Sequence, residues 1–459
     1  MLTIKVPISN DKNKIEYICN YIFKIRLNLL YKIDFISTDS ISIINDLDNS
    51  LIIGWQSSIL NIEIDKWHNL INPNDFLYKK NNGSHEKVFP IFSLTPAKKI
   101  IPQDSLLLNF DLFSSIFYIL TRAEEIHNTK RDNHNRFPYK ESIIYKYQII
   151  DRPIVDEYIE FISDKIIKKA GSNLLNYYLD KKGNQSFLIS CDVDSYNYFF
   201  NGLKYFLKLD LRSLIEQKEK FKNLFIKKLV HEITGYQNDP HKKGIDKILS
   251  INQIINSKPL FFFIPKVTNK QFDSFQTLEE EIIKKACKKI QKRGCDIGCH
   301  PGYDCYNNKS NMKESVEYFS KVNHMKTEIN SRMHYLRWDV LKTPEIINNT
   351  KINIDHSQGF AEHAGFRCGT SNPFKIYDIK NNNTTNVIAK PLIAMECSLI
   401  SNRYQGIKNP NMILSYLKKL INLCHKYGGT FSLLWHNSHF TNINDDYIYY
   451  VILNSLINE

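Results

Sequence analysis

Residues 186–196 read SFLISCDVDSY, an apolar run followed at once by two carboxylates. A short run of Phe, Leu and Ile that ends in polar residues is typical of a buried β-strand. Side chains two apart on a strand point to the same face, so Asp192 and Asp194 would look into one space, roughly 6.6 Å apart along the strand. The alternative is a solvated turn, where aspartate is common. The rest of the chain helps to decide between these two interpretations.

An apolar run with a polar residue at its carboxyl end recurs through the second half of the chain. Helical segments separate these runs, which predicts parallel βαβ units and, with six or more strands, a barrel or an open doubly wound sheet. Both architectures keep their chemistry at the carboxyl ends of the strands, and His300 and His436 follow such strands directly, as Asp192 does. The predicted strands are SFLIS (186–190), PLFFFIP (259–265), CDIGC (295–299), KINID (351–355), PLIAME (391–396) and TFSLLW (430–435).

The pattern of apolar and polar residues changes near residue 180. Before it, short apolar runs such as SLIIGW (50–55) alternate with polar stretches, and one helical segment covers residues 111–120. The turn-forming run DKKGNQ (180–185) then precedes the first strand of the second half. We therefore predict two α/β domains, a smaller accessory domain over residues 1–180 and a larger domain over residues 181–459.

Composition excludes several classes of protein. Hydrophobic residues make up 42% of the 459 residues, and no apolar run reaches the roughly 18 residues that a membrane helix needs, so we expect no integral membrane segment. The start of the chain lacks a basic stretch followed by a hydrophobic block, which favours a cytoplasmic protein. The nine cysteines are scattered, which favours reduced, mostly buried thiols. The net charge of +13 is spread along the chain, so no nucleic-acid partner is expected.

Three groups at strand ends could carry chemistry. In Asp192-Val193-Asp194, one carboxylate could hold a metal while the other contacts a water bound to it. A neutral imidazole at His300 suits a divalent metal, and Asp304 at i+4 would share its face if a helix began there. His436 is the usual kind of proton donor to a leaving group. Each residue alone is more often structural, so the functional interpretation depends on several strand ends converging.

Taken together, these stretches resemble the NodB-like polysaccharide deacetylases, in the branch that carries an additional N-terminal domain. In that family the first motif supplies a base and a metal-binding aspartate, the second supplies histidine ligands at i and i+4, the third an arginine that supports the base, and the fifth the catalytic histidine. TRAEE (121–125) and DNHNRF (132–137) are similar to the accessory domain of that branch. The five motifs occur in order as CDVDS (191–195), DIGCHPGYDCY (296–306), RMHYLRW (332–338), GFRCGTSNPF (365–374) and SLLWHNS (432–438).

The resemblance implies a distorted (β/α) barrel of about seven strands over residues 181–459 and a hydrolase that removes an N-acetyl group from a sugar or glycan precursor. The substrate would be a glycan or amino sugar, and the cofactor one divalent metal ion, zinc by analogy. Asp192 is then expected to be the base, His436 the acid, and Arg337 the residue that orients Asp192.

The same resemblance implies a metal held by Asp194, His300 and Asp304. Asp304 stands where the family has a second histidine, and more oxygen donors shift preference towards harder ions. Either Asp304 is a ligand, or another group completes the site, or the site binds no metal. The other candidate ligands are His334, His356 and His363.

Aromatic and basic residues near the proposed mouth are candidates for substrate binding: Tyr303, Trp338, Arg367 and Trp435. The alternatives are core aromatics and a loop-anchoring arginine. A backbone N–H near Tyr303 is a candidate oxyanion donor. Two other functions stay open, a catalytically inactive carbohydrate-binding protein on the same fold and a deacylase of a small non-glycan amide. The sequence does not indicate an oligomeric state.

Overall fold

The structure is a computed structural model of the 459-residue chain. It describes all residues except 9–10, 39, 49, 57–62, 74, 81–83, 94–99, 102–106, 109, 185, 199–225, 227–228, 231–238, 255–257, 275, 326–327, 441–442 and 458–459.

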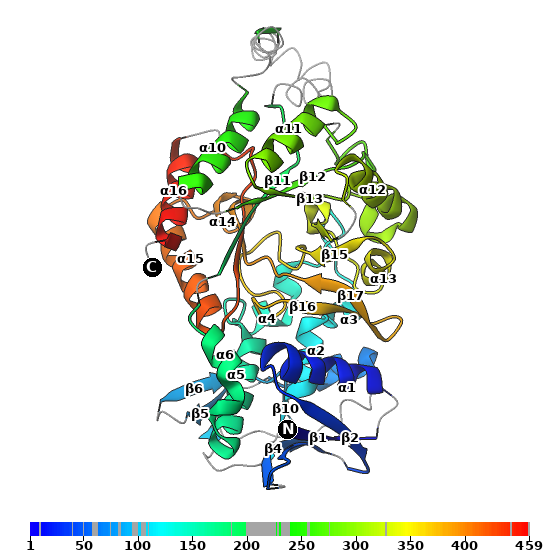
Figure 1. Cartoon of the computed structure of the whole chain (residues 1–459), viewed down its shortest axis with the longest axis vertical. Coiled ribbons are helices and arrows are strands. Elements are labelled where there is room, and N and C mark those ends of the chain that lie inside the picture. The colour runs from blue at the N-terminus through cyan, green and yellow to red at the C-terminus, as the bar shows by residue number, and fades with distance from the viewer. Residues whose placement is uncertain are drawn as a thin grey trace.

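A curled nine-stranded sheet forms the second half of the molecule, with helices packed around it (Figure 1). The strand order is β16-β17-β15-β14-β13-β12-β11-β19-β18, and every neighbouring pair is parallel except β16 and β17. The strands are β11 (Phe187–Val193), β12 (Leu260–Phe263), β13 (Asp296–Cys299), β14 (Ile329–Ser331), β15 (Ile352–Asp355), β16 (Phe374–Asp378), β17 (Asn383–Ala389), β18 (Ala394–Met395) and β19 (Phe431–Leu434).

All six predicted strands of this half are confirmed, as β11, β12, β13, β15, β18 and β19. The strand number is nine rather than about seven, and β16 and β18 lie at two separate edges, so the sheet is a half-barrel. Helices cover both faces of a parallel sheet, so its strands have apolar side chains on both sides and their sequences are continuous apolar runs. The four residues of β12, LFFF, are all buried in this way.

The helices of this half follow the strands and lie outside the sheet (Figure 1). They are α10 (Pro240–Ile254), α11 (Glu281–Lys292), α12 (Lys309–Val322), α13 (Thr343–Asn348), α14 (Glu396–Ile400), α15 (Pro410–Lys426) and α16 (Ile443–Ile457), with 3-10 turns η6 (Cys305–Asn307) and η7 (His334–Leu336).

The N-terminal half is built on a five-stranded sheet of order β2-β1-β3-β4-β9. The predicted strand at 50–55 is β4, and the predicted helix at 111–120 is α2, where the Asp111 side chain caps the helix by accepting from the Ser114 N–H at 2.9 Å. The sheets consist of β1 (Leu2–Pro7), β2 (Tyr31–Ile36), β3 (Ser40–Asn45), β4 (Ser50–Gln56) and β9 (Leu107–Leu108); β7 (Phe92–Ser93) and β10 (Phe110–Asp111); and β5 (Phe76–Lys79), β6 (His85–Val88) and β8 (Ile100–Ile101). The helices are α1 (Lys12–Cys19), the π-helix η1 (Asn20–Arg26), α2 (Leu112–Leu120), α3 (Glu124–His127), α4 (Ile143–Lys146), α5 (Ile154–Ala170) and α6 (Asn176–Lys181), with 3-10 turns η3 (Ile64–Leu70), η4 (Tyr139–Glu141) and η5 (Ser172–Leu175).

A buried polar cluster joins the two halves. The Asp156 carboxylate on α5 accepts from the Arg26 guanidinium on η1 and from the Thr370 hydroxyl, at 2.8 Å for the latter, and Arg26 also donates to the Tyr427 carbonyl at 3.3 Å. One continuous hydrophobic core contains residues of both halves. The domain boundary at residue 180 stays a prediction.

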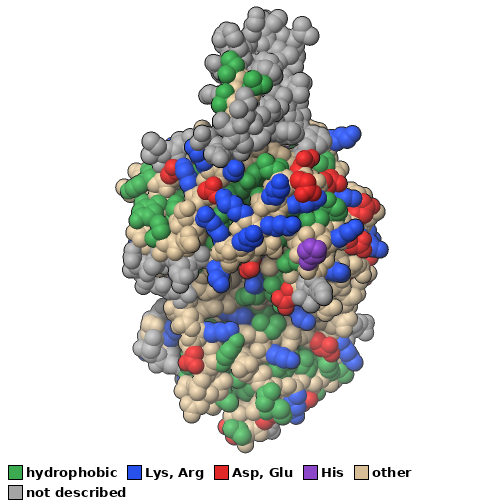
Figure 2. Space-filling view, turned by 45° about the horizontal axis from the view of Figure 1, so that its top comes forward, with side chains coloured by type: hydrophobic (Ala, Val, Ile, Leu, Met, Phe, Trp, Pro, Cys, Tyr) green, Lys and Arg blue, Asp and Glu red, His purple; other side chains and the backbone are tan. Residues whose placement is uncertain are grey.

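Surface and thiol chemistry agree with several expectations. All nine cysteines are unpaired, eight of them buried and Cys397 half-buried, which confirms the predicted buried thiols. Among the helices of the described ranges, none has both the length and the apolar character of a bilayer crossing. Figure 2 shows Lys and Arg side chains mixed with acidic and apolar ones over the face in view. The cytoplasmic location and the absence of a nucleic-acid partner stay predictions.

Replacing Asp156 by alanine should destabilise the protein strongly, because it leaves the buried Arg26 guanidinium without its counter-charge. Removal of one partner of a buried ion pair typically costs about 3–5 kcal/mol of unfolding free energy. Urea denaturation followed by circular dichroism measures the loss. The matched control is Glu281→Ala, which removes an exposed pair with Lys284 and should leave the unfolding midpoint unchanged. Equal midpoints for the two variants would contradict this role of Asp156.

Candidate functional site

The carboxyl ends of several strands open into one cavity of about 200 Å³. β11, β13, β18 and β19 each bring a polar side chain to it from their last residues or the residues that follow, as expected for parallel strands. Four of the predicted site residues therefore converge: Asp192, Asp194, His300 and His436. The complete lining is Arg136, Asp192, Asp194, His300, His334, Tyr335, Leu336, Ala361, Met395, Cys397, Tyr404, Leu434 and His436.

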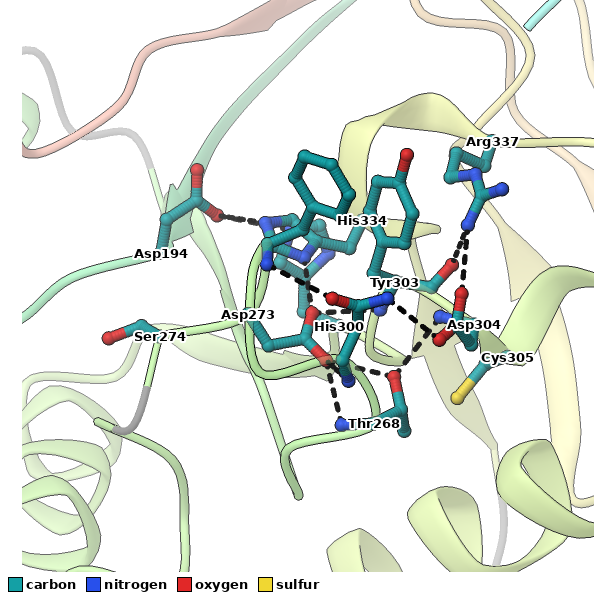
Figure 3. Close-up of polar contacts among 12 residues, drawn as sticks. Asp194, Thr268, Asp273, Ser274, His300, Tyr303, Asp304, Cys305, His334 and Arg337 are labelled. Carbon is teal, nitrogen blue, oxygen red and sulfur yellow. Dashed lines mark hydrogen bonds and ion pairs between the residues drawn. The ribbon is translucent and has the colours of Figure 1, made fainter. Parts of the chain in front are cut away.

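Asp194, His300 and His334 form a tight cluster within this cavity. Asp194 Oδ1 lies 3.2 Å from His300 Nε2 and 3.6 Å from His334 Nε2. One ligand atom from each of the three residues lies within 4.8 Å of the others. Figure 3 shows Asp194 facing the two imidazoles across a short gap.

The hydrogen bonds of the two imidazoles set their tautomers. His300 Nδ1 lies 2.5 Å from the Arg332 carbonyl oxygen, and His334 Nδ1 lies 2.8 Å from Asp273 Oδ1. A carbonyl or carboxylate oxygen can only accept, so in both rings Nδ1 carries the proton and donates it. Both Nε2 atoms are thereby directed towards Asp194. This is the arrangement in which a histidine presents a lone pair to a metal.

Asp273, which the sequence did not single out, is the residue that orients His334. Its fully buried carboxylate also accepts from the N–H groups of Thr268 (2.7 Å), Asn269 (2.8 Å) and Tyr303 (2.8 Å). Burial alone would raise the pKa of Asp273, but the bond from His334 and these N–H groups outweigh it and lower the pKa to about 2. Gly302 permits this contact, because a Cβ there would lie 2.7 Å from Asp273 Oδ2.

The cluster fits a divalent metal. Two imidazole nitrogens and one carboxylate oxygen are a donor set that suits zinc and similar ions. In the part of the chain that the structure describes, the buried Asp194 Oδ1 has no hydrogen-bond partner, an arrangement that costs about 1–3 kcal/mol or more. The three residues thus offer a negative, unsatisfied oxygen to a cation.

Asp304 lies outside this cluster, which corrects its assignment as a ligand. Its Oδ1 pairs with the Arg337 guanidinium at 3.2 Å and its Oδ2 accepts from Asn269 at 3.0 Å (Figure 3). The i+4 spacing from His300 would require a helix, whereas residues 300–304 form an irregular turn through Pro301 and Gly302. Of the alternative candidates, His334 joins the cluster. His356 binds Asn330 Oδ1 at 2.9 Å, and His363 bonds to the Ala364 carbonyl.

Asp192 is held by Arg332, which corrects the expectation for Arg337. Arg332 Nη1 donates to Asp192 Oδ1 at 2.7 Å and Nη2 donates to Ser190 Oγ at 3.0 Å. Arg332 is the first residue after β14, and its side chain reaches β11 across the inside of the curled sheet. Arg337 follows a left-handed turn at Tyr335 and Leu336 (φ 61° and 53°) and instead donates to the Tyr303 carbonyl at 2.6 Å.

His436 is paired with Glu396, a second functional residue that the sequence reasoning did not assign. His436 Nδ1 lies 2.5 Å from Glu396 Oε1, which leaves Nε2 facing the cavity, 3.6 Å from Asp194 Oδ2. Burial alone would lower the pKa of His436, but the Glu396 carboxylate outweighs it and raises that pKa well above its usual value. The available signal was the acidic residue that closes the predicted strand PLIAME.

None of the four predicted substrate-binding residues lines the cavity within the described chain. Tyr303, Trp338, Arg367 and Trp435 are all buried. Tyr303 stacks on Phe272, and Arg367 pairs with Glu125. These residues pack the walls around the site, and the Tyr303 N–H is already bonded to Asp273. This packing favours the alternatives of core aromatics and an anchored arginine, and substrate binding by these four residues stays a prediction.

The N-terminal half contributes Arg136 to the cavity lining. This residue belongs to the DNHNRF stretch (132–137), which lies against the turn that follows β13: His134 Nδ1 lies 3.1 Å from the Tyr303 hydroxyl, and Asn135 donates to the Tyr306 hydroxyl at 2.7 Å. Arg136 itself pairs with Asp132 at 2.7 Å and donates to the Tyr335 carbonyl at 3.3 Å. The N-terminal half therefore forms part of the cavity wall.

Comparison with known proteins adds three findings. A family of unknown function, DUF7033, matches residues 3–171. No curated protein matches the chain. Among solved structures, a Mycobacterium smegmatis protein described provisionally as a polysaccharide deacetylase aligns over 61% of this chain and 85% of its own, with 11% sequence identity and a TM-score of 0.39. The family model covers the N-terminal part of the chain, and the structural likeness is distant.

The purified protein should bind one equivalent of a divalent metal, and His334→Ala should weaken that binding by more than roughly 100-fold. Loss of a residue that merely orients a ligand already costs 10–100-fold, and His334 supplies one of the three donors. Isothermal titration with zinc measures the affinity. Asp304→Asn is the matched control and should bind as the wild type does. The opposite pattern, with metal lost in Asp304→Asn and kept in His334→Ala, would restore Asp304 as the ligand.

Proposed function

We propose that this protein is a metal-dependent hydrolase that removes an N-acetyl group from a sugar or glycan precursor. One observation carries the proposal: three kinds of group face the same cavity. They are the Asp192 carboxylate held by Arg332, the cluster of Asp194, His300 and His334, and the His436 imidazole held by Glu396. These are the groups that amide hydrolysis needs, a base, a cation site and an acid. The sugar is implied by the resemblance of the five motifs to the NodB-like deacetylases.

Asp194, His300 and His334 would hold the metal, zinc by the chemistry of the donors. When bound, such an ion polarises a carbonyl and lowers the pKa of a coordinated water. The histidine tautomers prepare the site in advance, because the Arg332 carbonyl and Asp273 keep both Nε2 lone pairs directed towards Asp194.

Asp192 would act as the base. Arg332 occupies Asp192 Oδ1, so Oδ2, 3.8 Å from His300 Nε2, is the oxygen that takes a proton from the attacking water. The buried guanidinium fixes the carboxylate in one orientation through a charge-assisted hydrogen bond. Positioning of this kind supplies part of the rate enhancement in general base catalysis.

His436 would protonate the departing amine. Its Nε2 faces the cavity while Nδ1 is held by Glu396. The Glu396 carboxylate raises the pKa of His436 and so favours the protonated imidazole, which would donate the proton at Nε2 when the C–N bond breaks. Base and acid therefore come from two adjacent strands, β11 and β19.

The cavity wall supports an acetyl group as the part that is removed. A small apolar cluster, separate from the main core, consists of Leu336, Ala361, Leu392, Met395 and Leu434, and four of these residues line the cavity. An acetyl methyl group is small and apolar, and such a cluster would shield it from water. Tyr335, Tyr404 and Arg136 add polar groups to the same wall, which suits the hydroxyl groups of a sugar.

The metal-loaded protein should release acetate from N-acetylated sugars, and Asp192→Asn should lower kcat by roughly 10²–10⁴-fold while keeping the metal. Acetate release from a panel of N-acetylated monosaccharides and oligosaccharides measures turnover, and metal analysis checks loading. Loss of metal in Asp192→Asn would mean that the two aspartates have exchanged roles.

The same assay separates the alternatives. No acetate release with sugars still bound would favour a carbohydrate-binding protein without catalysis. Hydrolysis of simple acyl amides, with N-acetylated sugars untouched, would favour a deacylase of small amides. Either result overturns the proposed activity.

Glu396→Gln should shift the alkaline limb of the pH–kcat profile to lower pH. The acid His436 is protonated below its pKa in the folded protein and loses its proton as the pH rises through that value. Glu396 raises the pKa of His436, so its removal makes the loss occur earlier. Asp304→Asn, which changes a carboxylate outside the cluster, should leave the limb in place. An unmoved limb in folded Glu396→Gln would assign the acid to another group.

A further inference from the structure

We propose that Glu396, Cys397 and His439 form a second cation site, beside the acid His436, whose occupation by zinc or another thiophilic divalent ion inhibits the enzyme. These three residues lie apart from the Asp194, His300 and His334 cluster and share no ligand with it. The existence of this site is independent of the proposed function, whereas the inhibition rests on it, since it acts through His436.

The three side chains already have the spacing of a metal site. Cys397 Sγ lies 3.3 Å from Glu396 Oε1 and 3.6 Å from the nearest nitrogens of His439, and His439 Nδ1 lies 3.1 Å from Glu396 Oε1. Tetrahedral metal bonds of roughly 2.0–2.3 Å separate ligand atoms by roughly 3.3–3.5 Å. All three edges of the triangle are close to that value, so a cation could bind with small side-chain shifts.

The backbone places these donors together and leaves them accessible. Glu396 and Cys397 are the first two residues of α14, directly after β18, and the His439 N–H bonds to the His436 carbonyl at 3.1 Å in the turn after β19. β18 and β19 are paired neighbours. The His439 side chain is 39% exposed and Cys397 lines the 200 Å³ cavity, so an ion can reach the site from solvent.

Glu396 has capacity for a cation. Its Oε1 holds His436, and in the described ranges its buried Oε2 has no hydrogen-bond partner. Thiolate and imidazole are donors that select zinc, cadmium or cobalt over magnesium or calcium. The Cys397 thiol would release its proton to solvent as the Sγ–metal bond forms, with no change in oxidation state.

Occupation of the site would compete with His436 for Glu396. A cation on Glu396 draws the carboxylate away from His436 Nδ1, so the imidazole loses the contact that holds its Nε2 towards the cavity. The expected result is activity that is maximal with one metal equivalent and falls as free zinc rises further.

Cobalt titration followed by near-ultraviolet absorption tests the site directly. The first site has no sulfur donor, so the first equivalent of Co²⁺ should add no thiolate-to-cobalt charge-transfer band, and a second equivalent should produce one. Cys397→Ser should abolish the band and keep the first equivalent, and His439→Gln should require more Co²⁺ to reach it. Cys295→Ser, which removes a buried thiol just before β13, is the matched control and should keep the band.

The two proposals fail in different ways. One bound equivalent without any band, in folded wild-type protein, overturns the second site and leaves the proposed function intact. A band with no binding at the Asp194 cluster supports the second site and removes the basis of the proposed function. The ratio of activities with and without excess zinc should fall in the wild type and stay near one in Cys397→Ser; equal inhibition of both would overturn the inhibitory role.

Discussion

The contacts of the buried Arg332 guanidinium hold the carboxyl ends of several strands together. Its side chain is fully buried, donates to Ser190 and Asp192 on β11 and to the His356 carbonyl after β15, and lies over the Phe262 ring of β12 at 4.5 Å. A buried guanidinium is tolerated only when its N–H groups are matched and its charge is balanced. These partners come from separate strands that must be correctly ordered. The orientation of Asp192 and the order of the strands are therefore fixed by the same contacts.

Three histidines of the cavity make the same kind of hydrogen bond to different partners. His300, His334 and His436 each use Nδ1 to bind a group behind the site, namely the Arg332 carbonyl, Asp273 and Glu396, and each directs Nε2 into the cavity. Two of the Nε2 atoms converge on Asp194 Oδ1 and the third lies near Oδ2, so one aspartate lies close to all three imidazoles. These three rings are chemically identical, and they differ in their position in the cavity and in the group that binds Nδ1.

Local sequence was sufficient for the features that depend on one strand. β12 and β19 are buried on both faces, so each is a continuous apolar run that the sequence reveals. The polar residues that follow such runs could therefore be placed at one edge of the sheet. β14 has the sequence INS, and β17 alternates buried and exposed positions without a long apolar run, so neither gave a signal. The choice of His334 over Asp304 and of Arg332 over Arg337 depends on turns at Gly302 and Tyr335, whose paths are set by tertiary contacts. Asp273 and Glu396 lie 61 and 40 residues from the histidines that they orient, beyond any local pattern.

The DNHNRF stretch has a consequence for how this protein can be divided. It supplies Arg136 to the cavity and binds the Tyr303 and Tyr306 hydroxyl groups beside the Asp194, His300 and His334 cluster. A fragment that begins near residue 180 would retain Asp192, Asp194, His300, His334 and His436 and yet lack Arg136 in the cavity wall. The nine-stranded sheet transplanted alone would therefore carry an incomplete cavity.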